Sequence, residues 1–255
     1  MKALYGSLII KLLIFLLFLF FLIFGFKPFK DSVDAEITLI DETDSYVSET
    51  RRLFDGSYLV AVRTPMPSVK ADMVRWWFLN FLNTTEHYKW WHPNDHVWMD
   101  WENKIPGEII GASHLVHEYI GGELSKLRIQ FVNPSEFFGY NPNNEDTFVI
   151  CARAGLIDRE INIAKMCHVV KNNENGSEMR SRFWLGHVSA RKGSHIVLSL
   201  ASFLGNMAIS RVIGLGKKDA EDLKLHAEEE MLFLAKLLPD LFNAEEYESR
   251  KSDLD

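Results

Sequence analysis

The stretch LKLHAEEEMLFLAKLL, residues 223–238, has the spacing of an amphipathic helix, and the rest of the fold is predicted to assemble around it. An α-helix has about 3.6 residues per turn, so residues three or four apart share a face. One apolar stripe is formed by Leu223, Phe233, Leu234, Leu237 and Leu241. Because a folded domain buries such a stripe against another layer, we expect this helix to pack in the core.

Two polar residues, His226 and Glu230, lie inside this apolar stripe, one helical turn apart. A His–Glu pair at this spacing is commonly a solvated pair on a helix surface. On a buried face, however, an isolated charge is costly unless it is paired or ligated. The position of the pair therefore raises a second interpretation, in which both side chains ligate a metal ion.

The middle of the chain alternates polar and apolar residues with the period of two that is typical of β-strands. The strand-like segments are residues 57–67, 108–120, 124–132, 147–155, 161–171 and 178–189. The turn-rich sequence NNENGS, residues 172–177, predicts a hairpin between the last two. Residues 68–82 have helical spacing with Ser68 as a candidate N-cap, and residues 83–101, rich in Asn, Pro and Asp, are predicted to be a loop.

This order of elements predicts an α+β domain: a helix, a run of antiparallel strands, and helical sequence from residue 199 onward, with the sheet wrapped around the long C-terminal helix. We divide the chain into an anchor at 1–30, a polar tether at 31–55, the folded domain at 56–245 and a disordered tail at 246–255.

Composition indicates a packed domain, because 47% of residues are hydrophobic and 13% are aromatic. The formal net charge of −7 gives no electrostatic reason to expect nucleic acid as a partner. The two cysteines, Cys151 and Cys167, lack CxxC spacing and are expected to be free buried thiols, although neighbouring strands would allow them to pair. Nothing in the sequence indicates the oligomeric state.

Residues 7–26, SLIIKLLIFLLFLFFLIFGF, are apolar except for Lys11 near the start. At a rise of about 1.5 Å per residue, a helix of this length reaches roughly the 30 Å of bilayer hydrocarbon. No A-x-A-like exit follows, which favours an uncleaved single-pass membrane anchor over a signal peptide. Lysines balance one another on the two sides, so the side of the membrane that holds the domain is not indicated.

Glu118 and His168 also occupy faces that are otherwise mostly apolar. Glu118 follows a valine and precedes an isoleucine on one face of the strand at 108–120, and His168 shares a face with Met166 and Val170. Taken alone, Glu118 is more commonly a buried ion-pair partner, which Arg128 or Arg153 would serve, and His168 is more commonly a hydrogen-bonded core histidine.

Two further histidines, His92 and His96, lie in the tryptophan-rich segment 83–101. A loop of this composition more commonly fills the core as a hydrophobic plug than binds a substrate. Together with the helix pair and Glu118, either one of the two histidines completes a set of two imidazoles and two carboxylates. Such a set suits Zn²⁺ or a similar divalent ion. The HExxH spacing of zincin proteases is absent.

The sequence resembles the diacetylphloroglucinol hydrolase and phloretin hydrolase family between about residues 57 and 243. The resemblance depends on several segments in the same order: WWF (76–78), YKWWHPNDH (88–96), VHEYIG (116–121), MCHVV (166–170), EMRSRFWLGH (178–187) and HAEEE (226–230). The family comprises zinc enzymes with a Bet v 1-like, helix-grip fold. They hydrolyse the carbon–carbon bond between a phenolic ring and an acyl carbonyl.

Carried over by position, the resemblance implies a zinc site of His96, Glu118, His226 and Glu230, and leaves His92 outside the ligand set. It implies further that two catalytic residues lie beside the site. Tyr88 would hydrogen-bond substrate phenol oxygens, and His168 would be an active-site imidazole, for which we expect general acid–base work near neutral pH.

Two positions depart from the family pattern. Met99 replaces an asparagine and Phe183 replaces a tyrosine, so two hydrogen-bonding groups are missing from the implied substrate pocket. Each lost partner is worth of order 1 kcal/mol or more. The expected substrate is therefore a less hydroxylated or more apolar acyl compound than a polyphenol.

The predicted function is zinc-dependent, retro-Claisen hydrolysis of a carbon–carbon bond next to an acyl carbonyl in a hydrophobic small molecule. Two alternatives stay open at this point. One is a membrane-anchored helix-grip protein that binds a lipid or other apolar ligand without catalysis. The other is a zinc hydrolase that acts on ordinary esters or amides.

Overall fold

The computed structural model describes residues 9–19, 39–40 and 46–252, with side chains up to residue 244. The strands are β1 (Glu49–Arg52), β2 (Tyr58–Pro67), β3 (His96–Glu102), β4 (Ser113–Ile120), β5 (Glu123–Val132), β6 (Thr147–Leu156), β7 (Ile161–Asn173), β8 (Gly176–Lys192) and β9 (His195–Val197). The helices are α3 (Ala71–Trp76), the π-helix η1 (Trp77–Phe81), α4 (Thr85–Trp91), α5 (Ser135–Phe138), α6 (Leu200–Gly205), α7 (Ala208–Gly214) and α8 (Lys217–Ser252).

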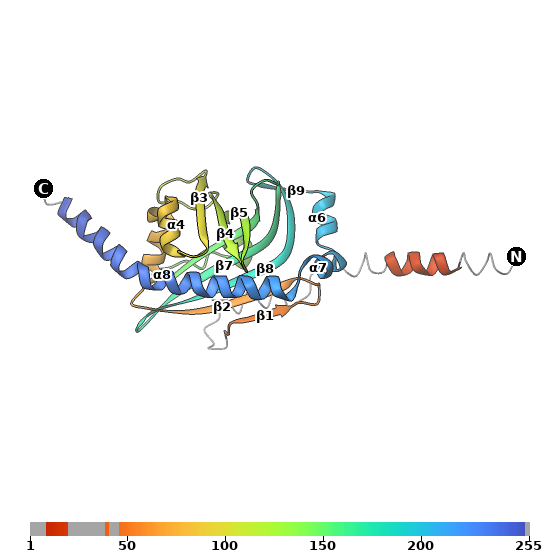
Figure 1. Cartoon of the computed structure of the whole chain (residues 1–255), viewed down its shortest axis with the longest axis horizontal. Coiled ribbons are helices and arrows are strands. Elements are labelled where there is room, and N and C mark those ends of the chain that lie inside the picture. Colours follow the sequence, from red (N-terminus) through yellow and green to blue (C-terminus); the bar gives the residue numbers. More distant parts are fainter. Residues whose placement is uncertain (1–8, 20–38, 41–45, 253–255) are drawn as a thin grey trace.

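The strands form one antiparallel sheet in the order β1-β2-β8-β7-β6-β5-β4-β3, with β9 paired to β8. Helix α8 runs along this sheet, as Figure 1 shows. Of the predicted stripe, Leu234 is fully buried in the main core, and Leu237 and Leu241 pack against that core while partly exposed. Met231 and Leu238, which were not part of the predicted stripe, are also fully buried there. The antiparallel sheet and the long C-terminal helix of the predicted α+β fold are thus confirmed.

The six predicted strand segments correspond to β2 and β4–β8, and NNENGS forms the β7–β8 turn. The predicted N-cap is wrong. Ser68 has a left-handed φ of 64°, and α3 begins three residues later, at Ala71. The amide of Ala71 is capped from another element, because it donates to Asn172 Oδ1 at 2.8 Å. A cap supplied from across the fold leaves no local pattern in the sequence.

The loop predicted over residues 83–101 is wrong. Thr84 caps α4 by accepting a hydrogen bond from the His87 amide, and the helix ends before Pro93. Strand β3 follows at once, at the edge of the sheet. The polar residues that led to the loop prediction lie at the N-cap of α4, in the turn between α4 and β3, and on the solvent-facing side of β3. This correction matters because the segment carries His96.

The two cysteines are not free. Cys151 on β6 and Cys167 on β7 are direct cross-strand partners with their Cα atoms 4.1 Å apart, and they form a disulfide. Sixteen residues separate them in the chain, so only the register of the β6–β7 pair brings the two thiols together.

The ordered domain also extends beyond the predicted boundaries. Within the predicted tether, β1 pairs with β2, and Leu39, Tyr46 and Leu53 are buried in a cluster on the sheet. At the other end, α8 continues to Ser252 through the predicted tail. The charged side chains of β1 are exposed or partly exposed, which is why this part of the sequence resembles unstructured chain.

Of the predicted anchor, the structure describes residues 9–19, which are helical with exposed apolar side chains. The rest of 7–26 lies outside the described residues. Among the helices that are described, none is both long and apolar enough to cross a membrane.

Candidate metal centre

The four predicted ligands come together from three elements, with one ligand on β3, one on β4 and two on α8. His96 on β3 and Glu118 on β4 are direct cross-strand partners, so their side chains leave the sheet side by side. His226 and Glu230 lie one turn apart on α8, on the face that meets the sheet. All four residues are buried, with at most 9% of their surface exposed.

The potential ligand atoms of His96, His226 and Glu230 lie within 4.8 Å of one another. His96 Nε2 lies 3.4 Å from Glu230 Oε2 and 3.9 Å from Glu118 Oε2. His226 Nε2 lies 3.9 Å from Glu230 Oε2 and 4.0 Å from Glu118 Oε2. Four ligands in a tetrahedron about Zn²⁺, at bonds of about 2.0–2.2 Å, stand roughly 3.3–3.6 Å apart. Small side-chain movements suffice to reach that spacing.

A β-bulge puts His96 on the inner face. The register of β3 against β4 shifts between His96 and Trp98. Without the extra residue, strict alternation would place His96 on the face opposite to Met99, which lies in the core. The bulge therefore turns the imidazole of an edge strand toward α8.

The hydrogen bond of His96 selects the tautomer that a metal needs. Its Nδ1 lies 2.8 Å from the Tyr88 carbonyl oxygen, and a carbonyl can only accept, so Nδ1 carries the proton. The lone pair is then on Nε2, which is buried and has no hydrogen-bond partner among the described residues. A buried acceptor without a partner is costly unless something else binds it.

His226 has the same arrangement. Its Nδ1 donates to Asp95 Oδ2 at 3.1 Å, and its Nε2 is also buried and without a partner in the described part of the chain. A carboxylate behind a histidine is the usual support for a metal-ligating imidazole, because it fixes the ring and raises the basicity of the other nitrogen. Asp95 supplies that support here.

His92 lies beside this centre with the opposite tautomer. Its Nδ1 accepts from the Asp95 amide at 3.3 Å, so the proton is on Nε2. Its Nε2 lies 3.6 Å from Asp95 Oδ2 and 3.5 Å from Glu229 Oε2, and it has no hydrogen-bond partner among the described residues. His92, Asp95 and His226 also form a second group whose ligand atoms lie within 4.8 Å of one another, so the exclusion of His92 from the ligand set stays a prediction.

Charge is poorly balanced at this centre without a cation. Burial raises the pKa of Glu230 to about 7, and burial lowers the pKa of His96 to about 4. Burial also opposes protonation of His226, but Glu230, Glu118 and Asp95 outweigh it and raise that pKa. A bound divalent cation removes this competition for protons, because it stabilises both carboxylates and uses the neutral imidazoles.

Tyr88 supports two of the ligands at once. Its hydroxyl donates to Glu118 Oε2, its carbonyl orients His96, and its ring stacks on the His96 ring with centroids 3.7 Å apart. Burial and the neighbouring Glu118 carboxylate raise the pKa of Tyr88 well above its ordinary value. Its hydroxyl is therefore a neutral donor, and the structure gives the residue a positioning role that the sequence did not predict.

His168 lies on the inner face of β7, apart from this centre. Its Nδ1 is 2.7 Å from Ser181 Oγ, and its ring meets Phe183 edge-on. It forms no hydrogen bond or ion pair with the four ligand candidates within the described residues. The expectation that it titrates near neutral pH is wrong, because burial lowers its pKa to about 4.

The two predicted pocket residues are both buried but belong to different apolar clusters. Met99 packs in the main core with Tyr88 and Val116, whereas Phe183 packs against Ala227 of α8. Their contribution to a substrate pocket stays a prediction.

The arginines proposed as partners for Glu118 are used elsewhere. Arg128 Nε donates to Glu102 at 2.8 Å, and Arg153 pairs with Glu136. The ion-pair interpretation of Glu118 therefore fails, and its charge is met by Tyr88 and the two imidazoles.

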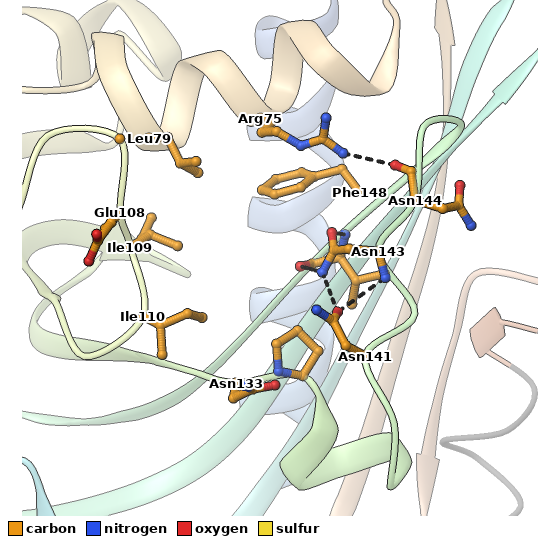
Figure 2. A pocket seen from close by; sticks show the side chains of 13 residues that line it. Arg75, Leu79, Glu108, Ile109, Ile110, Asn133, Asn141, Asn143, Asn144 and Phe148 are labelled. Atoms are coloured by element: carbon orange, nitrogen blue, oxygen red, sulfur yellow. Dashed lines mark hydrogen bonds between the residues drawn. The ribbon is translucent and has the colours of Figure 1, made fainter.

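A cleft of about 580 Å³ opens elsewhere on the molecule, and Figure 2 shows its lining. Arg75, Phe148 and a set of asparagines surround it, and Arg75 donates to the Asn144 carbonyl at 3.0 Å. None of the four ligand candidates lines this cleft.

Two buried or partly buried residues near the centre were missed by the sequence reasoning. Asp95 lies in the turn between α4 and β3, and only the fold brings it to His226. His114, two strand positions from Val116, stacks on Trp101 and meets the Tyr88 ring edge-on. Its place on the same face as Glu118 was the signal that could have found it.

The chain is similar in sequence to known hydrolases. A family model described as DAPG hydrolase PhiG domain matches residues 35–243. Phloretin hydrolase from Eubacterium ramulus is 26% identical over 201 residues, which cover 75% of this chain and 69% of the relative. A 2,4-diacetylphloroglucinol hydrolase from Pseudomonas protegens is 27% identical over 208 residues, covering 72% and 63%. The chain thus spans less than two thirds of the length of this second relative.

Solved structures with a similar fold are more distant. Ara h 8.0201 has a TM-score of 0.42 and 9% identity, over 71% of this chain and 97% of that chain. A Thalictrum norcoclaurine synthase point mutant has a TM-score of 0.39 and 11% identity, over 74% and 98%.

Proposed function

Because the chain belongs to the DAPG hydrolase PhiG domain family, we propose that it is a zinc-dependent hydrolase that cleaves the carbon–carbon bond between an acyl carbonyl and a phenolic or related carbon. One observation carries the zinc part of the proposal. Two buried imidazole nitrogens without partners, one on His96 and one on His226, face two buried carboxylates at 3.4–4.0 Å.

The donor set fits zinc. Two imidazole nitrogens and two carboxylate oxygens match its preferred ligands, and both histidines already have the required tautomer. When bound, zinc supplies Lewis acidity and lowers the pKa of a coordinated water. His96, Glu118, His226 and Glu230 would hold it.

The protein's own residues orient this centre and move protons. Tyr88 keeps Glu118 in place, and Asp95 keeps the lone pair of His226 on Nε2. The net reaction adds the hydroxyl of water to the acyl carbon and a proton to the departing carbon. We propose His168 for proton transfer; it forms no hydrogen bond or ion pair with the four ligand candidates among the described residues, and burial lowers its pKa to about 4, which makes its neutral imidazole a weak base.

We further propose an apolar substrate. Met99 and Phe183 are buried and cannot hydrogen-bond ring hydroxyls, so an acyl compound with few hydroxyl groups suits them better than a polyphenol.

The test combines metal analysis with product identification on the purified full chain. Wild type is expected to contain one zinc per chain, and His226→Ala to lose most of it. His117→Ala is the matched control, since His117 neighbours Glu118 on the same strand but is partly exposed and stacks on Trp98. Absence of stoichiometric zinc in wild type would refute the metal centre.

Products separate the remaining functions. With acyl-phenols and β-diketones, carbon–carbon hydrolysis yields a carboxylic acid and a new C–H bond, whereas ester hydrolysis yields an alcohol. If zinc-loaded protein binds such compounds without turnover, the alternative of an apolar ligand-binding protein replaces the hydrolase. The apolar Met99 and Phe183 are the observation that favours this alternative.

For location, we propose that residues 7–26 anchor the chain in a membrane by a single span. The support is the apolar sequence of this segment, in which Lys11 is the only charged residue, and protease protection of the full chain in vesicles tests it.

A further inference from the structure

The face formed by β9, α6 and α7 exposes many large apolar side chains. They are Leu198, Leu200, Leu204, Ile209, Val212 and Ile213. Leu200 is 71% exposed and Ile213 is 79% exposed, although both lie in helices. We call this set the α6–α7 face. Scattered apolar residues are normal on a surface, but a contiguous group on consecutive elements marks an interaction site.

The polar side chains of these two helices point inward, which is the reverse of an ordinary surface helix. Asn206 accepts from the Val188 amide at 3.0 Å and also donates to the Val188 carbonyl. Arg211 is buried, donates to the Gly186 carbonyl at 2.8 Å and pairs with Asp55. These bonds to β8 and the β1–β2 turn hold the helices in one orientation, so the outward apolar side chains are a fixed feature of the fold.

The α6–α7 face is continuous with the apolar N-terminal segment. Ile14, Leu17 and Phe18 of the helix at 9–19 line an apolar hollow of about 340 Å³ together with Met207, Ala208 and Ile209. Figure 1 shows this helix at the end of the molecule that carries α7, opposite to α4. The two apolar surfaces therefore form one end of the protein.

Charge indicates what covers this end. The chain has 35 acidic residues and a net charge of −7, yet residues 179–218, which include the whole α6–α7 face, contain no Asp or Glu. In α7 and at the start of α8, Arg211 pairs with Asp55, Lys217 with Glu221 and Lys218 with Asp222, so the exposed Lys192 at the end of β8 carries the positive charge at this end. A partner with an apolar interior and an anionic surface would complement both the exposed apolar side chains and the positive charge of this end.

We propose that the α6–α7 face docks onto a lipid bilayer with anionic headgroups, so that the domain lies against the membrane at this end. The leucines and isoleucines enter the boundary between headgroups and acyl chains, and Lys192 contacts the anionic headgroups. The inference goes beyond the anchor proposed above, because a span at 7–26 alone would leave the domain free in water.

The test uses the full chain in phosphatidylcholine vesicles with and without phosphatidylserine. A polarity-sensitive fluorophore is attached to one introduced cysteine at a time: Leu200→Cys, Ile213→Cys, Lys89→Cys on α4, or Leu13→Cys in the anchor. The native cysteines do not react because they form a disulfide. A nitroxide on the lipid acyl chains then reports contact with the bilayer.

We expect a blue shift and lipid quenching of the labels at 200, 213 and 13, and an aqueous label at 89. Since one lysine near an anionic surface is worth about 1 kcal/mol, Lys192→Ala is expected to reduce the docked fraction roughly fivefold with phosphatidylserine present.

Three results would overturn the proposal. Docking is refuted, and the anchor stands, if the labels at 200 and 213 stay in water while the label at 13 is quenched by lipid. If the label at 13 also stays in water, the anchor is refuted as well. A blue shift at 200 and 213 that rises with protein density and shows no lipid quenching assigns the face to a second copy. Equal docking of wild type and Lys192→Ala on both vesicles removes anionic lipid as the partner.

Discussion

Removal of Asp95 is expected to weaken zinc binding without removing a ligand. Asp95 Oδ2 accepts from His226 Nδ1 at 3.1 Å and keeps the lone pair of His226 on Nε2. Loss of such an outer partner typically costs about 10–100-fold in metal affinity. Because the Asp95 side chain is 29% exposed, water replaces part of the interaction, and we expect a loss near the lower bound for Asp95→Ala. Tenfold corresponds to about 1.4 kcal/mol.

The assay is competition for zinc between the full chain and a chromophoric chelator, at fixed pH and ionic strength. Thermal unfolding provides a second readout, since zinc stabilises the folded chain in proportion to the logarithm of its affinity. The zinc-loaded variant is expected to lose about 1.4 kcal/mol of unfolding free energy relative to wild type, while the zinc-free proteins unfold alike. Asp95→Asn keeps an acceptor oxygen and is expected to lose less.

Asp100→Ala is the matched control. Its carboxylate lies on the solvent side of β3 and accepts only from the neighbouring Trp101 amide, so zinc affinity is expected to stay at the wild-type value. Equal zinc affinity of Asp95→Ala and Asp100→Ala would refute the assignment of Asp95 as the support of His226. A fall in both would indicate general damage to β3 and its turn.

The other predictions concern protons, hydrogen bonding and the disulfide. Burial lowers the pKa of His168 from 6.5 to about 4. Between pH 6.5 and 4, the His168 imidazole is therefore protonated in the unfolded chain and neutral in the folded chain. The free energy of unfolding should therefore fall by up to about 3 kcal/mol as the pH drops from 6.5 to 4. In urea titrations, the unfolding free energy of His168→Gln should depend less on pH than that of wild type. An equal pH dependence in the two proteins contradicts the burial argument. Tyr88→Phe keeps the stacked ring but loses the hydrogen bond to Glu118, so isothermal titration should show a zinc affinity reduced roughly tenfold. A variant with wild-type zinc affinity would show that Glu118 does not need this hydrogen bond. Replacing Cys151 and Cys167 together by Ala should lower the free energy of unfolding in urea by about 3 kcal/mol, since the cross-link closes a loop of 16 residues. A loss below about 1 kcal/mol would indicate that the pairing of β6 with β7 already orders this loop.

The sequence predicted the strands β2 and β4–β8 and the helix α8 well, because each has a local periodicity that one buried face imposes. It also marked Glu118, His226 and Glu230 by the same reasoning, as charged residues in apolar patterns. The resemblance to the hydrolase family, based on motifs along the chain, is confirmed by the family match to residues 35–243.

Segments that lack such a pattern were predicted less well. Strand β3 is at the sheet edge, so its solvent face is polar, and its bulge breaks the alternation that would have identified it. Strand β1 is the other edge and was assigned to a tether for the same reason. The apolar residues of α6 and α7 predicted helices but not their inverted orientation, which depends on the hydrogen bonds of Asn206 and Arg211 to β8.

By itself, the sequence determined which elements form and which of their charged residues cannot stay buried alone, because periodicity and the cost of desolvation act within a few neighbouring residues. Only the tertiary structure decided which side chains meet. The bulge that turns His96 inward, the approach of Asp95 to His226 and the pairing of Cys151 with Cys167 all depend on strand register and helix placement. Those are set by the packing of the whole sheet against α8, and contacts between residues far apart in the chain leave no local pattern to read.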